Sequence, residues 1–275
     1  MSIRDRLGIA LLCAFLLVLF AIIRFPYDRM QPAIVALIEG ATGARVEIDS
    51  CTGGLAWTGP RLRLEGLALH FPSGDQLSLD RVALRPALSY RWLLADPSAA
   101  IDARGPAGRA RGALGPRHLE LELEEVDLSA FPRAWLGGEE PPVEGLLTAE
   151  LDLVLGDLGY EGPLALESSD GNLILPGLPL AIPFESLEGN FELTESGDLV
   201  VEALELEGPM VSAITRGSVG TSATPLETAA LELDIELLQV DRALHATIAR
   251  YGGKLDGDGA AQFRLSGTVG RPNIE

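Results

Sequence analysis

The sequence has few of the residues that hold metals, form disulfides or bind nucleic acid. Only 2 Cys and 3 His occur among 275 residues, which excludes a Cys-rich zinc site and a disulfide framework. Basic residues are also scarce, with 21 Lys+Arg against 40 Asp+Glu and a formal net charge of -19. This balance disfavours contact with nucleic acid phosphates. We expect no nucleic-acid partner, no metal site and no cofactor.

Catalytic motifs are absent as well. The chain contains no G-x-S-x-G elbow, no G-x-x-x-x-G-K-[ST] loop and no H-E-x-x-H pair. His70, His118 and His245 are far apart in the sequence and are interpreted as ordinary surface or half-buried imidazoles. Asp256-Gly-Asp258-Gly lacks the later ligands of a calcium loop and is interpreted as a turn. We expect no catalytic residues and no enzyme activity.

One long apolar run opens the chain. Leu7–Ile23 is 17 uncharged residues closed by Arg24, or about 26 Å of helix. The alternative is a cleaved signal peptide, but its apolar region is usually shorter, and no A-x-A-like site follows Ala21. We predict an uncleaved transmembrane anchor over residues 1–24 with a cytoplasmic N-terminus, since a long C-terminal domain translocates largely regardless of charge.

The acidic residues lie mainly in the second half of the chain. Residues 1–133 hold 15 basic and 15 acidic side chains, whereas residues 134–275 hold 6 and 25. An anionic membrane surface repels the second half, so the N-terminal end is expected nearest the membrane. Cys13 lies in the apolar run and Cys51 beyond it, so they cannot pair. Cys51 is expected to be a buried, inert thiol, the alternative being a bridge between two chains.

The rest is predicted to be one short helix followed by many strands. Pro32–Glu39, with Pro near its start and Gly40 after its end, indicates a juxtamembrane helix within residues 25–44. From residue 45 to 275 apolar and polar residues alternate, as in half-buried strands. The clearest runs are 45–49, 61–69, 77–84, 119–126, 147–155, 199–208, 230–238 and 261–269. Glu120, Glu122 and Glu124, between leucines, are interpreted as a solvated strand face.

Turn residues separate these runs, which predicts a mostly antiparallel sheet of about a dozen strands. The predicted hairpin turns are 73–75, 156–157, 170–171, 196–198 and 257–259. Residues 87–97 have helical spacing and are interpreted as a short helix or cap, with Trp92 in core packing. The Gly/Pro-rich stretch 137–142 is a linker candidate and places a lobe boundary near 137–145 of the β domain 45–275.

How the apolar face is covered stays open at this point. The sheet can close as a sandwich or barrel with a dry core. It can instead curl into a trough that leaves an apolar groove for acyl chains or for a partner's apolar segment. Aromatic content of 5% slightly favours an unfilled interior, because large rings are the usual fillers. Leu233 is expected to face inward in either arrangement.

One local basic cluster stands out in an acidic protein. Arg104, Arg109, Arg111 and Arg117 lie in a Gly/Pro-rich stretch. Their guanidinium groups are candidates to bind lipid phosphates or an acidic partner, the alternative being that they balance local acids on a solvated loop.

Several segments resemble the AsmA-like proteins of Gram-negative envelopes. They are the apolar span and short helix, ATGARVEIDS at 41–50, the strands within 62–86, FESLEGNFELTESGDLVVEALELEG at 184–208 and FRLSGTVGRPNI at 263–274. FPYDRM after the span and SYRWLLADPSAAIDARG at 89–105 are most similar to the type II secretion system protein N group. The resemblance covers essentially the whole chain.

The resemblance implies an inner-membrane protein with a periplasmic, taco-like β domain. Its expected role is in type II protein secretion, by contacts with other components such as the inner-membrane platform and the secretin. The alternative that the wider clan implies is handling of phospholipid in an apolar β groove. The combined expectation is a mainly β protein: one N-terminal transmembrane helix, a juxtamembrane helix and an elongated, mostly antiparallel, curled sheet.

Overall fold

The computed structural model describes residues 27–56, 59–87, 97–130, 143–157, 159–173, 181–220, 228–250, 256, 259–269 and 271–274. These are almost entirely β-strand. The chain divides into two compact units, unit 1 to Pro106 and unit 2 from Ala107. No helix of the described residues is long and apolar enough to cross a membrane, and the predicted span Leu7–Ile23 lies outside them.

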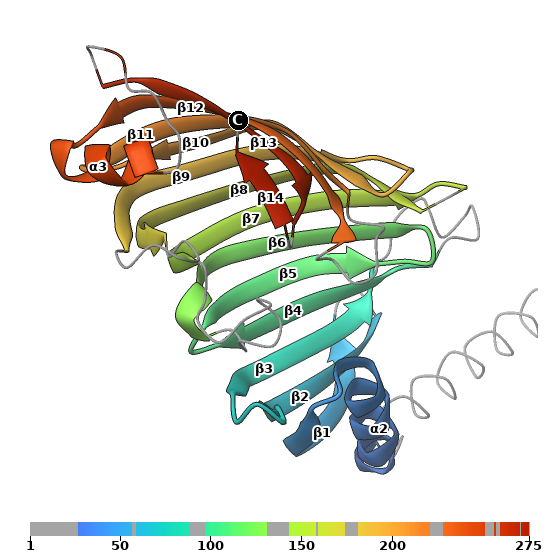
Figure 1. The fold of residues 1–275 in the computed structure, drawn as a ribbon. Helices are drawn as coiled ribbons and strands as arrows, with labels where there is room; N and C mark the ends of the chain where they lie inside the picture. The colour runs from blue at the N-terminus through green and yellow to red at the C-terminus, as the bar shows by residue number, and fades with distance from the viewer. Residues whose placement is uncertain are drawn as a thin grey trace, which may run out of the picture. The chain divides into compact units, whose positions relative to one another are not determined.

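Unit 1 is a four-stranded antiparallel sheet with strands in sequence order (Figure 1). Its strands are β1 (Arg45–Ala56), β2 (Gly59–His70), β3 (Gln76–Pro86) and β4 (Ala99–Gly105). Leu64, Leu67 and Leu69 of β2 are 2–5% exposed. They oppose Cys51, Ile48 and Val46 of β1 in register. The predicted turn at 73–75 joins β2 and β3, with the Phe71 N–H donating to Asp75 O.

The predicted helix is confirmed and is longer than expected. A short 3-10 turn η1 (Tyr27–Met30) leads into α2 (Gln31–Thr42). Gly40, expected just past the end, lies inside the helix. Gly43, at φ 68, is the left-handed residue that ends it, and its N–H donates to Glu39 O. The Val46 N–H donates to Glu39 Oε1 and Gln31 Nε2 donates to Ile48 O, so polar bonds fasten α2 to β1.

Unit 2 is a ten-stranded antiparallel sheet, again in sequence order. Its strands are β5 (Gly108–Leu114), β6 (His118–Asp127), β7 (Val143–Leu155), β8 (Tyr160–Leu173), β9 (Ile182–Leu193), β10 (Asp198–Glu207), β11 (Val211–Gly220), β12 (Ala230–Val240), β13 (Ala261–Thr268) and β14 (Arg271–Ile274). The 3-10 turn η3 (Leu128–Ala130) follows β6 and helix α3 (Arg242–Arg250) follows β12. β5 and β14 do not pair, so this sheet is open. The mainly antiparallel β fold is confirmed.

The predicted turns have different outcomes. Those at 156–157 and 196–198 join β7 to β8 and β9 to β10, as expected. The one at 170–171 is wrong, because Asp170, at φ 52, lies inside β8. Asp170 and Gly171 together oppose one residue of β7, Gly145, where the β7–β8 register shifts. This is a β-bulge, which also favours turn-type residues. At 257–259, Gly257 and Asp258 lie outside the described residues.

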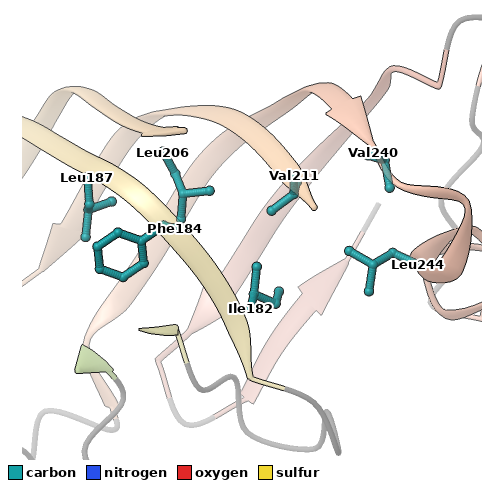
Figure 2. Close-up of a cluster of buried hydrophobic side chains, with 7 residues drawn as sticks. All are labelled: Ile182, Phe184, Leu187, Leu206, Val211, Val240 and Leu244. Carbon is teal, nitrogen blue, oxygen red and sulfur yellow. The ribbon is translucent and has the colours of Figure 1, made fainter. Parts of the chain in front are cut away.

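Helix α3 closes one end of unit 2 and was not predicted, because its nine residues are shorter than the window in which a helical period can be recognised. Figure 2 shows Leu244 of α3 facing residues from the ends of four strands. The cluster is Ile182, Phe184, Leu187, Leu206, Val211, Val240 and Leu244. In the antiparallel sheet β9 and β11 begin, and β10 and β12 end, at the same edge, and Leu244 of α3 joins the cluster there.

Two predicted features lie outside the described residues: the helical or cap segment, of which 88–96 are not described, and the linker 137–142. The lobe boundary near 137–145 stays a prediction. The strands on either side of it, β6 and β7, pair directly.

Phe184→Ala is expected to lower the free energy of unfolding by about 3–5 kcal/mol, because the ring is 3% exposed and its loss leaves a cavity. Leu114→Ala is the matched control, since Leu114 is 49% exposed. Urea unfolding followed by circular dichroism measures both. Equal, small effects would mean that the cluster does not stabilise unit 2.

Cys51 is 7% exposed, as predicted for a buried thiol. Burial raises its pKa above the ordinary value, and the negative charge of Asp28 adds to the rise. At pH 8 it therefore holds less thiolate than a free cysteine, and alkylation should be slow in the native protein and fast in denaturant. Bromobimane labelling of the Cys13→Ser variant between pH 7 and 9 measures this. Native labelling at the rate of free cysteine would contradict it.

Candidate functional site

The candidate site of unit 2 is the apolar face of its sheet. Directly opposite residues of an antiparallel pair share a face, so the register can be followed from strand to strand. One row of such residues crosses β6 to β14. This first apolar row is Leu121, Leu151, Leu164, Phe191, Val201, Gly217, Leu233, Leu265 and Ile274.

A second apolar row runs beside the first. It is Leu123, Ala149, Leu166, Gly189, Leu204, Thr215, Ile235 and Phe263. In most strands the two rows are two residues apart, but in β10 Val201 and Leu204 are three apart. A bulge at Glu202 and Ala203 makes up the difference, because without it one residue would point to the opposite face. The bulge therefore keeps the apolar face continuous.

Gly217 of β11, in the first row, lies very close to the backbone of β12. Its φ is 140, and a Cβ added there would lie 2.1 Å from the backbone oxygen of Glu232. No other residue fits without moving β12. The first apolar row therefore has no side chain between Val201 and Leu233.

The rows are only partly covered. Leu121, Leu151, Leu164, Leu233 and Leu265 are all half-buried rather than buried. In the described part of unit 2, packing between secondary-structure elements is mainly between sequential strands, with η3 against β7 and α3 at one end. No second sheet of the described residues faces the rows. The described residues thus do not form a closed sandwich, and apart from the end near α3 they place no second layer on the apolar face.

The polar face carries most of the carboxylates. Glu120 opposes Asp152 and Glu122 opposes Glu150 across β6 and β7. Farther along, Glu188 of β9 opposes both Glu167 of β8 and Glu205 of β10. Like charges directly opposite each other in a sheet are destabilising. The interpretation of Glu120 and Glu122 as exposed is confirmed, whereas Glu124 is half-buried and ion-paired.

Three of the four predicted arginines lie beside carboxylates. Arg104 belongs to unit 1, where its Nε lies 3.2 Å from Asp102 Oδ1. Arg109 and Arg111 of β5 share Glu124, at 3.4 and 2.9 Å. Arg117 is exposed in the turn before β6. Three of the four therefore balance nearby carboxylates, and contact with lipid phosphate or an acidic partner stays a prediction.

The histidines differ from the expectation in one case. His70 is partly exposed beside Glu47, and His245 Nε2 lies 3.3 Å from Val240 O. His118 is only 5% exposed, so its interpretation as a surface or half-buried imidazole is wrong. It is the first residue of β6, and alternation alone does not show what covers a strand end.

No cluster of metal-ligating side chains occurs among the described residues. At the interpreted turn Asp256 Oδ1 accepts from the Ala260 N–H and the Asp256 N–H donates to Ala260 O. No protein-family model, curated protein or solved structure matches the chain.

Proposed function

We propose that unit 2 binds the acyl chains of phospholipid along its two apolar rows and so serves in lipid traffic in a bacterial envelope. The observation that carries this is the half-buried apolar face, continuous across nine strands with no second layer among the described residues. An apolar face of this extent normally marks a binding surface. Acyl chains suit it because aliphatic leucines dominate and few groups are present to form hydrogen bonds.

Two features of the sequence also support this proposal. The apolar run Leu7–Ile23 supports a membrane anchor, which holds a lipid-binding domain next to its source of ligand. The resemblance to AsmA-like proteins supports an inner-membrane location with the β domain in the periplasm.

A benzophenone amino acid at position 233 is expected to crosslink to phospholipid on illumination of cells that express the full chain. The same amino acid at position 232 is the matched control, because neighbouring strand residues face opposite sides of the sheet. Mass spectrometry of the purified chain identifies the adduct. Equal crosslinking from both positions, or from neither, would exclude the apolar rows as the binding surface.

Leu233→Asp is expected to reduce the phospholipid that copurifies with the full chain, because a carboxylate in the row must be desolvated when an acyl chain binds. Leu238→Asp, in the same strand but 48% exposed, is the control and should keep its lipid. Native mass spectrometry with lipid extraction measures both. If Leu233→Asp instead only unfolds the domain, the interior is a closed core.

A second candidate function is that of a protein-contact component of type II secretion. The observation favouring it is the ladder of opposed carboxylates on the polar face, which a partner with basic groups would neutralise. Affinity purification of the full chain from a secreting cell is expected to recover components of the inner-membrane platform or the secretin. Recovery of lipid with none of these components would leave the first function.

A further inference from the structure

An open hollow of about 480 Å³ lies over β5 to β8, and its charged lining residues belong to the polar face of the sheet. Glu120 and Glu122 of β6 and Glu150 and Asp152 of β7 line it together with Arg111 of β5. The rest of the lining is Gly112, Leu121, Leu151, Pro163 and Ala165. Ala165 opposes Glu150 in register and has a short side chain, which leaves space beside the carboxylates.

Gly112 is required at its position. A Cβ there would lie 2.1 Å from the backbone oxygen of Glu120, a contact that no side chain allows. The close approach of β5 to β6 therefore fixes one wall of the hollow.

The charge inside the hollow is not balanced by the described residues. Two opposed pairs, Glu120 with Asp152 and Glu122 with Glu150, place four carboxylates side by side. The one cation in the lining, Arg111, has its guanidinium 2.9 Å from Glu124. Neither Glu122 nor Glu150 has an ion pair or side-chain hydrogen bond with any residue that the structure describes.

A buried imidazole lies beside the first carboxylate pair. The His118 side chain is 6% exposed, with Nε2 3.5 Å from Glu120 Oε2 and Nδ1 3.5 Å from Asp152 Oδ1. Its Nδ1 has no hydrogen-bond partner among the described residues. A buried polar atom normally has a partner, and here the ring nitrogens are directed at two carboxylates that line the hollow.

We propose that this hollow binds an arginine side chain of a partner protein. A guanidinium presents five N–H donors in a planar fork that matches paired carboxylates, and a compact ammonium does not. Once seated, it neutralises the repulsion between the opposed pairs and completes the hydrogen bonding of the carboxylates around His118. The excess of acids over bases in residues 134–275, 25 against 6, attracts such a segment from a distance.

A directly coordinated metal ion fits the hollow less well. Calcium and magnesium require oxygen ligands converging at about 2.0–2.6 Å. No group of three such side chains among the described residues converges in that way. The size of the hollow also suits a side chain better than a bare ion.

The test uses the full chain in a neutral detergent with selectively labelled histidine. Because the chain holds only 3 His, the imidazole signals of His70, His118 and His245 can be assigned one by one. The probe is the peptide acetyl-Gly-Arg-Gly-Arg-Gly-amide, and its citrulline analogue, equal in shape but neutral, is the ligand control. We expect the arginine peptide to shift the His118 signals alone and the citrulline peptide to shift none.

The Glu122→Gln/Glu150→Gln variant is expected to bind the arginine peptide about tenfold more weakly, because one of the two carboxylate pairs is removed. The matched control is Glu202→Gln/Glu207→Gln, which removes the same charge from exposed positions of β10 and should change binding less than about twofold. Unchanged His70 and His245 signals verify that each variant is folded.

Three results would overturn the proposal. Absence of peptide binding is the first. Equal weakening in both variants is the second, since it would mean that only the overall acidic charge attracts the peptide. The third is a His118 shift with calcium or magnesium chloride at the concentrations that suffice for the peptide, which would make the hollow an inorganic cation site. Lipid binding is tested separately by crosslinking at position 233, which is not part of the lining of the hollow.

Discussion

The register of the antiparallel pairs is the constraint on which the rest of unit 2 depends. Each strand pairs with the next in sequence, so residues of the same kind meet across the whole sheet. Leu121 thereby reaches Ile274 through seven intervening strands. A slip of one residue in any pair would exchange the apolar and acidic faces beyond it. Both proposed surfaces exist only because the register holds.

Bulges correct the register where the sequence would otherwise break it. Glu124 and Glu125 of β6 oppose one residue of β7, Thr148, and Glu125 takes a positive φ of 48. The bulge of β8 at Asp170 and that of β10 at Glu202 act in the same way. Each inserts one residue and strengthens the local twist. Such twist brings the half-buried leucines of a ten-stranded sheet closer to one another, on a face that no second layer of the described residues covers.

The sequence predicted the strands well and their irregularities poorly, for a physical reason. Alternation has a period of two, which identified runs such as 147–155 and 230–238 and the turn at 196–198. A bulge and a hairpin turn use the same residue types, so Asp170-Gly171 predicts a turn where the structure has a bulge. Helix α3 is short, and only the strand ends around Leu244 explain its apolar side. The burial of His118 and the sharing of Glu124 by two arginines depend on neighbours across strands, which no local pattern shows.

The two faces of the sheet result from the same alternation of residues, but different forces act at each face. Hydrophobic burial along the rows is short-ranged and nearly independent of salt, whereas attraction to the opposed carboxylates weakens as ionic strength rises. A single layer of strands separates them, so one molecule can present an acyl-chain surface and an acidic surface at once. Each surface can bind its ligand while the other is empty, because the two surfaces are formed by alternate residues of the same strands. The two proposed functions, lipid handling and protein contact, are therefore compatible in one sheet, and salt dependence separates their contributions.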